Sequence, residues 1–481
     1  MSLTQNQFAH MLEAHDFFEP ETPIAIARAP GRLDFMGGNV DYSGGMVLQS
    51  LLQEAVWVAV QPRSDDVIRI LNPGAADRGW RVYFEIRLTV STDAASLRAI
   101  CHQSQDLRWL AYVLGTFHYL QRYLVPGRVL GANLFIASDL PPNKGISSSA
   151  ALEIAVLKAV STAHDISLTG IALATAGQWV ENVIVGSACG IMDQAAIVLG
   201  QRDQLLPLVC QPCHPLPPVT LSSDLCIWGI DSLAPRATVS EAYETARAAA
   251  FIGYKLICQR EDVNIALDEV SEIPRWTDPR WNGYLSNLTP SEFHSSYERW
   301  LPESASGREC LARIETHVDP FTRIHPNRDY PIRAAVRYAT EENARVRMVQ
   351  SLLESSSLGT SDTTLKQLGE ILRDSHAAYA DCGLRSEACD SLVARIRKAG
   401  IAGAKMTGGG AGGVVAALGR PEDEQALHRV AKDHAAERHA PPCLFSGTSD
   451  GVDIFNVRLH RSGMLRPLLA SRRHRRLASS F

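Results

Sequence analysis

The sequence lacks a long apolar run and a strong charge of either sign. No stretch approaches the roughly 18 apolar residues that a membrane-spanning helix needs. The first residues, Met-Ser-Leu-Thr-Gln-Asn, have neither the basic nor the apolar region of a signal peptide. The formal net charge is −5, and charged residues make up 21% of the chain. We therefore expect no membrane and no nucleic acid as partner, and a cytoplasmic protein. The basic residues 472–476 are interpreted as a solvated tail.

Cysteine clusters are also missing. The ten cysteines are scattered along 481 residues, whereas a disulfide scaffold concentrates them in a short chain. Cys210 and Cys213 form a lone C-x-x-C pair before His214, and no second ligand pair follows at the spacing of a zinc site. We expect free thiols in a reducing compartment.

The chain is long enough for two domains at about 100–200 residues each. Strands are expected at 24–28, 46–60, 80–87, 133–138, 225–230 and 414–418, and a tight glycine turn at 30–38. Helices are expected at 109–124, 149–164, 173–185, 240–259, 331–353 and 363–382. Prolines between 211 and 218 suggest a boundary. We predict α+β domains at 1–215 and 216–462 and a basic tail at 463–481; residues 271–330 show only weak periodicity.

Three glycine-rich segments stand out. The first, 30–45, carries the polar residues Arg32, Asp34, Asn39 and Asp41 between glycines. Short carboxylates and amides suit sugar hydroxyls, and glycines let the backbone come close to a ligand. The alternative is a turn with solvated polar side chains.

The second segment, 140–151, places Gly145 and three serines before an apolar helical pattern. Unpaired backbone N–H groups at a helix start bind phosphate. The segment has no G-K-[ST] triplet and is therefore not a P-loop. The alternative is serine capping of the helix without a ligand.

The third segment, 405–413, holds five glycines within six positions, 408–413. Ordering glycine costs conformational entropy, and close approach to a ligand would justify that cost. Apolar segments on both sides argue against the alternative, a floppy linker. Asp193 lies in the segment 189–194, downstream of Glu181 at the end of an expected helix.

Together these segments resemble the GHMP kinase superfamily, in the expected order and over nearly the whole chain. Residues 28–45 and 189–194 resemble the galactokinase branch. Residues 31–38, 206–212, 251–253 and 405–413 are most similar to the kinase half of L-arabinokinases. The resemblance implies the two-domain GHMP fold with the active site in the interdomain cleft. It also implies transfer of the γ-phosphate of ATP to the anomeric hydroxyl of a galactose-configured sugar.

The resemblance also implies residue roles. Asp193 would act as the base beside Arg32, and Ser149 with Glu181 would bind Mg²⁺. Trp109 would pack on adenine. The phosphates would bind Lys144, Gly145, Ile146, Ser147, Ser148 and Ser149. The sugar would bind Asp34, Gly38, Asn39, Asp41, Tyr42, Gly190, Tyr243 and Gly409.

Two departures bear on the substrate. Galactokinases carry Glu and His where this chain has Gly38 and Asn39, and that Glu reaches the carbon-six hydroxyl of galactose. Its absence fits L-arabinose, which has no carbon-six arm, and leaves galactose and galacturonate open. Residues 231–238 depart in turn from the corresponding arabinokinase segment.

Two further readings compete: a non-catalytic sugar sensor on the same fold, and a kinase of another GHMP branch. The presence of Arg32, Ser149, Glu181 and Asp193 together favours the enzyme, and residues 41–45 favour the galactokinase branch. The sequence carries no signal for oligomeric state, and a monomer is our expectation.

Overall fold

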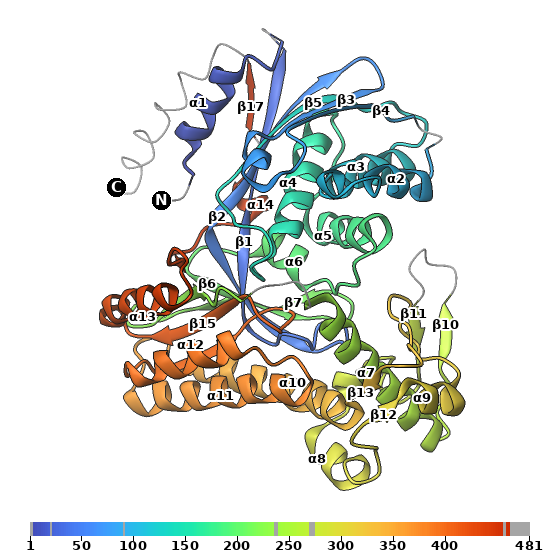
Figure 1. Cartoon of the computed structure of the whole chain (residues 1–481), viewed down its shortest axis with the longest axis vertical. Helices are drawn as coiled ribbons and strands as arrows, with labels where there is room; N and C mark the ends of the chain where they lie inside the picture. Colours follow the sequence, from blue (N-terminus) through green and yellow to red (C-terminus); the bar gives the residue numbers. More distant parts are fainter. Residues whose placement is uncertain are drawn as a thin grey trace, which may run out of the picture.

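The computed structural model describes residues 3–19, 22–89, 92–234, 239–268, 275–455 and 458–461. The basic tail predicted at 463–481 lies outside them. The described chain is α+β, with a large sheet and its helices above a smaller sheet and its helices (Figure 1). None of the described helices is long and apolar enough to cross a membrane.

The upper sheet contains nine of the described strands in the order β17-β1-β2-β5-β3-β4, with β6 on β2 and with β7 and β8 on β6. Its pairs are antiparallel except β3 with β5. The strands are β1 (Pro23–Met36), β2 (Met46–Arg63), β3 (Val67–Leu71), β4 (Tyr83–Arg87), β5 (Gly131–Ser138), β6 (Gln204–Val209), β7 (His214–Pro215), β8 (Val219–Thr220) and β17 (Arg458–Arg461).

Helices cover both faces of this sheet. On one face lie α2 (Ala94–Cys101), α3 (Leu110–Tyr119), α4 (Ser148–Ala163), α5 (Gly170–Trp179) and α6 (Met192–Leu199), with α14 (Val452–Phe455) beside α6 (Figure 1). Helix α1 (Gln5–His15) covers the other face, where Phe8 stacks on Trp57.

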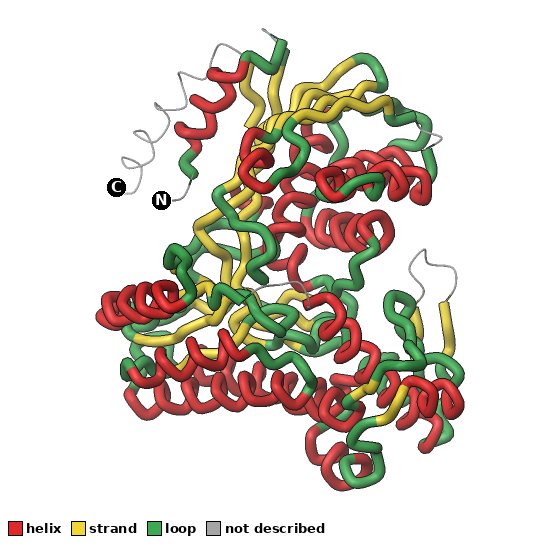
Figure 2. Tube along the Cα trace, viewed as in Figure 1, coloured by secondary structure: helices red, strands yellow, loops and turns green. Residues whose placement is uncertain are grey.

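The lower sheet has the order β14-β15-β9-β16 and is antiparallel. Its strands are β9 (Cys226–Asp231), β14 (Gly403–Met406), β15 (Val414–Gly419) and β16 (Leu444–Phe445). The helices α10 (Ile332–Ser355), α11 (Asp362–Asp381), α12 (Glu387–Lys398) and α13 (Glu424–Glu437) pack around it, as the tube in Figure 2 shows.

Described residues from Ala248 to Ala339 build a second core beside this sheet, away from the main one. It joins α7 (Val239–Arg260) and the start of α10 to short elements from the segment of weak periodicity. These are β11 (Arg275–Thr277), α8 (Pro290–Glu292), β12 (Ala305–Ser306), α9 (Gly307–Ile314) and β13 (Asp329–Tyr330). Strand β10 (Ala266–Asp268) precedes the segment and pairs with β11. The expected short helices and loops are therefore present, together with short strand pairs.

The other expected helices and strands form within a few residues of their predicted bounds, but the tight turn at 30–38 is wrong. Strand β1 runs through Met36, and register shifts after Pro30 and after Asp34 absorb the irregular residues. The chain turns later, where Gly37 and Gly38 have φ of 118° and 53°. The proposed division at 215 and 216 stays a prediction; the large sheet includes β8 and also takes β17 from the end of the described chain.

Candidate active site

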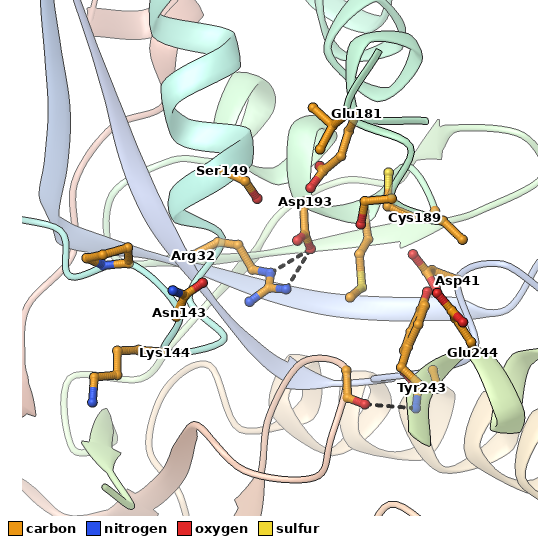
Figure 3. A pocket seen from close by; sticks show the side chains of 18 of the residues that line it. Arg32, Asp41, Asn143, Lys144, Ser149, Glu181, Cys189, Asp193, Tyr243 and Glu244 are labelled. Atoms are coloured by element: carbon orange, nitrogen blue, oxygen red, sulfur yellow. Dashed lines mark hydrogen bonds and ion pairs between the residues drawn. The ribbon is translucent and has the colours of Figure 1, made fainter. Parts of the chain in front are cut away.

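A cavity of about 970 Å³ lies where the two sheets meet. Its walls come from the end of β1, the loop before α4, residues 181–193, the start of α7 and the third glycine segment. Figure 3 shows Arg32, Ser149, Glu181 and Asp193 on one side of this cavity and Asp41 with Tyr243 on the other. All three glycine-rich segments therefore contribute to one site.

Asp193 is held from two directions. Arg32 donates to its Oδ1 from Nε at 2.8 Å and from Nη2 at 2.6 Å, and the Ser147 hydroxyl donates to Oδ2 at 2.5 Å. Arg32 is 3% exposed and also donates from Nη1 to the Gly145 carbonyl at 2.7 Å. Burial alone would lower the pKa of Arg32, but attraction from Asp193 and Asp34 raises it. The result is a fixed carboxylate beside a permanent cation.

Arg32 also fixes the loop before α4 by hydrogen bonds. The Arg32 backbone N–H also donates to the Ile146 carbonyl at 3.2 Å, so strand β1 holds the loop by backbone and side chain. Ser147 has φ of 58° and makes no capping bond to α4. Its hydroxyl donates to Asp193 instead. Capping of α4 therefore does not account for the serine at position 147.

Ser149 and Glu181 lie on the α4 side of Asp193. Burial, and then repulsion from Asp193, raise the pKa of Glu181 to about 7, against hydrogen bonds from Ser149 and Gln194. A cation placed here would favour the ionised form. Among the described residues, no three His, Cys, Asp or Glu side chains gather as a metal site. A hydroxyl and one carboxylate fit Mg²⁺, which usually completes its shell with water and phosphate oxygens.

Glu153 is a buried carboxyl that sequence reasoning missed. The Gln194 amide donates to Glu181 Oε2 at 2.9 Å and to Glu153 Oε2 at 3.3 Å, which links the two carboxyl groups. Burial raises the pKa of Glu153 well above its ordinary value, as does repulsion from Glu181. A glutamate one turn after Ser149, in the largely apolar first half of the helix, was the available signal.

Asp41, Tyr243, Asn39, Gly190 and Gly409 line the opposite end of the cavity. A Cβ on Gly190 would lie 1.8 Å from Asp41 Oδ2, so only glycine fits beside this carboxylate. The Asn39 amide points to the Gly409 carbonyl at 3.5 Å. Burial, and then repulsion from Asp193, raise the pKa of Asp41 to about 7, and Arg247 opposes the rise.

Three predicted sugar ligands do not line this cavity. Asp34 is fully buried, where it accepts from Gln49 Nε2 at 2.7 Å and from the Gly408 N–H at 3.1 Å. It therefore supports the third glycine segment. Tyr42 packs behind Asp41, against Tyr243 and Phe251.

Gly38 is enclosed by tyrosines. A Cβ at this position would lie 1.7 Å from Tyr379 Oη and 2.8 Å from Tyr338 Oη. Tyr379 Oη itself donates to the Gly408 carbonyl at 2.8 Å. A glutamate side chain cannot start at position 38 unless Tyr379 moves.

Lys144 lines the cavity, yet its ammonium lies 2.6 Å from Asp231, away from Asp193 (Figure 3). Val414 N–H donates to the Lys144 carbonyl at 3.0 Å, and Ser232 N–H donates to Gly413 at 2.9 Å. The lysine thus ties the loop before α4 to the lower sheet. A phosphate contact would require this ion pair to open.

A second cavity, of about 500 Å³, adjoins the first and shares Tyr112, Pro142, Asn143, Ser149 and Val185 with it. Trp109 and Trp80 both line it, with ring centroids 6.5 Å apart and planes at 17°. Trp109 is only 5% exposed, whereas Trp80 is half-buried. Trp80, which sequence reasoning missed, lies 29 residues upstream in a segment without any ligand motif.

The sequence matches three family models. They are the GHMP kinases N terminal domain over residues 111–201, the galactokinase galactose-binding signature over 15–62 and the GHMP kinases C terminal over 352–436. These spans include most of α3, the loop before α4, Asp193 and Asp41.

Curated relatives agree with these matches. The chain is 31% identical to an L-arabinokinase of Arabidopsis thaliana over 93% of its own length and 48% of the relative, so it spans about half of that protein. It is 28% identical to a galactokinase of Roseiflexus sp. over 89% of its length and 93% of the relative.

Solved structures share the fold. A Lactococcus lactis galactokinase complexed with galactose has a TM-score of 0.70 at 23% identity, over 92% of this chain and 97% of that one. An L. major mevalonate kinase has a TM-score of 0.53 at 13% identity, over 90% and 99%. The chain therefore carries the N-terminal and C-terminal domains of GHMP kinases together with the galactose-binding signature of galactokinases.

Proposed function

We propose that this protein is an ATP-dependent kinase that phosphorylates the anomeric hydroxyl of a galactose-configured sugar, with L-arabinose as its preferred substrate. The observation that carries the proposal is the arrangement of Asp193, fixed by Arg32 and Ser147 between the serines of α4 and the Asp41–Tyr243 wall. The likeness to an L-arabinokinase over 93% of the chain supports the same activity.

Each end of the cavity has its own task. Asp41, Asn39 and Tyr243 offer hydrogen-bonding groups for ring hydroxyls, and Gly190 and Gly409 leave room for the ring. Asp193 would accept the proton of the attacking hydroxyl. Arg32 holds that carboxylate in place by two hydrogen bonds and offsets negative charge that develops beside it.

The nucleotide would lie across the two adjoining cavities. Its base would enter the cavity of Trp80 and Trp109, and its phosphates would meet the N-terminus of α4 at Ser148 and Ser149. Ser149 and Glu181 would hold Mg²⁺, which neutralises phosphate charge when bound. Glu181 must be ionised for that task, and Gln194 fixes its carboxylate by one hydrogen bond.

The preference for a pentose rests on position 38. Tyr379 fills the space in which an acidic side chain would begin, so position 38 supplies no carboxylate for a carbon-six hydroxyl. L-arabinose lacks that hydroxyl and loses no contact. Galactose carries an extra CH₂OH that would find no such partner, and a poorly fitting group of that size costs about 1–3 kcal/mol.

We also propose that the protein acts in the cytoplasm as a monomer. All ten cysteines are free thiols, six of them buried, which suits a reducing compartment. Analytical ultracentrifugation with and without ATP would test the monomer.

The kinase assignment is tested by Asp193→Asn. Turnover, measured by coupled ADP release with L-arabinose, should fall at least about a hundredfold, as for the loss of a general base. ATP binding by calorimetry should stay within about twofold. The exposed Asp433→Asn is the matched control. Near-normal turnover of the Asp193 variant would remove this residue from the chemistry.

A further inference from the structure

The segment 275–330, whose function the sequence left open, reaches the sugar end of the cavity through one buried ion pair. Arg247 on α7 donates to Asp319 from Nε at 2.9 Å and from Nη2 at 2.8 Å. The two side chains are 3% and 0% exposed. A bidentate pair with this burial is rigid, and breaking one partner would leave an uncompensated charge.

Asp319 is itself fixed by its own loop. The Thr322 hydroxyl donates to its Oδ2 at 2.6 Å, and the Phe321 N–H approaches Oδ1 at 3.4 Å. The Asp319 N–H donates to His317 Nδ1 at 3.2 Å. Hydrogen bonds within the loop therefore fix the Asp319 carboxylate, which in turn holds Arg247 in place.

The guanidinium of Arg247 is packed among aromatic rings. Its carbon lies 5.1 Å from the ring centre of Tyr42 and 5.4 Å from that of Phe321. Tyr42 in turn meets Tyr243 edge to face at 5.9 Å, and its N–H donates to Asp41 Oδ1 at 2.7 Å. Arg247 thus lies directly behind the two residues that face the sugar.

Arg247 and Tyr243 also share one face of α7, because they lie four residues apart. One nitrogen of Arg247, Nη1, is buried without a hydrogen-bond partner among the described residues. Asp319 pairs with the other side of the guanidinium, while part of its positive charge acts on Asp41 and Tyr243. This field lowers the pKa of Asp41, against burial and against Asp193, which both raise it.

We propose that Arg247 and Asp319 are a positioning pair that sets the geometry and charge of the Asp41–Tyr243 wall, so that the segment 275–330 acts as a specificity element for the sugar. The inference rests on the proposed sugar-kinase function. Neither residue lines the cavity, so neither contacts substrate. Their effect should fall on the sugar and spare the nucleotide, whose cavity shares no residue with this cluster.

The test replaces the pair as a unit. The double variant Arg247→Met/Asp319→Leu removes both charges and avoids the unpaired buried charge that a single substitution leaves. We expect the KM for L-arabinose to rise at least tenfold, with the KM for ATP within twofold and kcat within threefold. Arg247→Lys keeps the charge but loses the bidentate contact with Asp319. Its sugar KM should lie between those of the wild type and the double variant.

The matched control is Tyr254→Phe. This substitution removes the hydrogen bond from Tyr254 to Asp278 in the same second core, away from the cavity, and should leave both KM values unchanged. Folding is checked by thermal melting. If the double variant does not fold, the sugar KM of Arg247→Lys is compared with that of Tyr254→Phe. A sugar KM that rises only in Arg247→Lys supports the positioning pair, and equal values overturn it.

Two outcomes are kept apart. A folded double variant whose sugar KM stays within twofold of wild type overturns the positioning pair, as does an equal rise in sugar and ATP KM. If the wild type phosphorylates no sugar, the proposed function fails instead. Calorimetric binding of L-arabinose to wild type and double variant then tests the pair, with at least a tenfold weaker Kd expected.

Discussion

Trp80→Ala tests where the nucleotide base binds. Trp80 and Trp109 both line the second cavity, but their exposures differ: Trp109 is only 5% exposed, and its indole nitrogen is buried without a partner among the described residues. Trp109→Ala would open a core cavity at a cost of about 3–5 kcal/mol in stability. Trp80 is half-buried and more accessible, so its truncation should be better tolerated.

The expected loss follows from stacking. Alanine substitution of an aromatic side chain under a base costs about 1–3 kcal/mol, which is roughly 5-fold to 150-fold in Kd. Arg78 already lies over the Trp80 ring, 5.4 Å from its centre, so one face of the indole is partly covered. We therefore expect the lower half of that range for ATP, and a sugar KM within twofold of wild type.

The assay is calorimetric titration of ATP, with L-arabinose KM measured in parallel. Trp300→Ala is the matched control, since Trp300 is also half-buried and carries the Arg260 guanidinium 4.8 Å from its ring centre. It does not line either cavity near Ser149. If folded Trp80→Ala binds ATP as tightly as wild type does, the base lies elsewhere.

Three more predictions follow from the cavity. Glu181→Gln should raise the Mg²⁺ concentration for half-maximal rate, because a charged oxygen ligand is lost; an unchanged Mg²⁺ dependence would contradict its role. Asp41 has a pKa of about 7, so its ionised form disappears as the pH falls through 7 and the sugar KM should rise there. Asp41→Asn should flatten that pH dependence. A wild-type sugar KM that stays constant from pH 8 to 6 would contradict a role of ionised Asp41 in sugar binding. Gly38→Glu should lower the melting temperature and not confer galactose preference, because Tyr379 occupies its Cβ position; a stable variant that favours galactose would show that Tyr379 moves aside.

The motifs located much of the site before the fold was known. Arg32, Ser149, Glu181 and Asp193 come from different segments, yet they meet in one cavity. Glycine-rich segments are informative in this way because glycine lets the backbone turn tightly and approach a ligand closely. Six of the helices were also predicted, since their apolar periodicity is strong over 10–24 residues, whereas α1, α12 and α13 were not.

Side-chain partners were less predictable, because they depend on packing between distant segments. Lys144 was expected at a phosphate, and Asp231 holds it instead at 2.6 Å. Gly38 was expected at the sugar, and Tyr379 from α11 encloses it. Trp80 begins an expected strand and Asp319 lies in the segment of weak periodicity, and no local pattern connects either residue to a ligand. Such contacts follow from the tertiary fold alone.

The most direct test of the central claim compares two sugars on the wild-type enzyme. The measurement is kcat/KM for L-arabinose and for D-galactose at saturating ATP and Mg²⁺, with D-galacturonate in a third arm and phosphorus NMR to identify the product. We predict an anomeric phosphate, and a kcat/KM for L-arabinose about 5-fold to 150-fold above that for galactose, the equivalent of about 1–3 kcal/mol. A well-folded enzyme whose kcat/KM for galactose equals or exceeds that for L-arabinose would contradict the account.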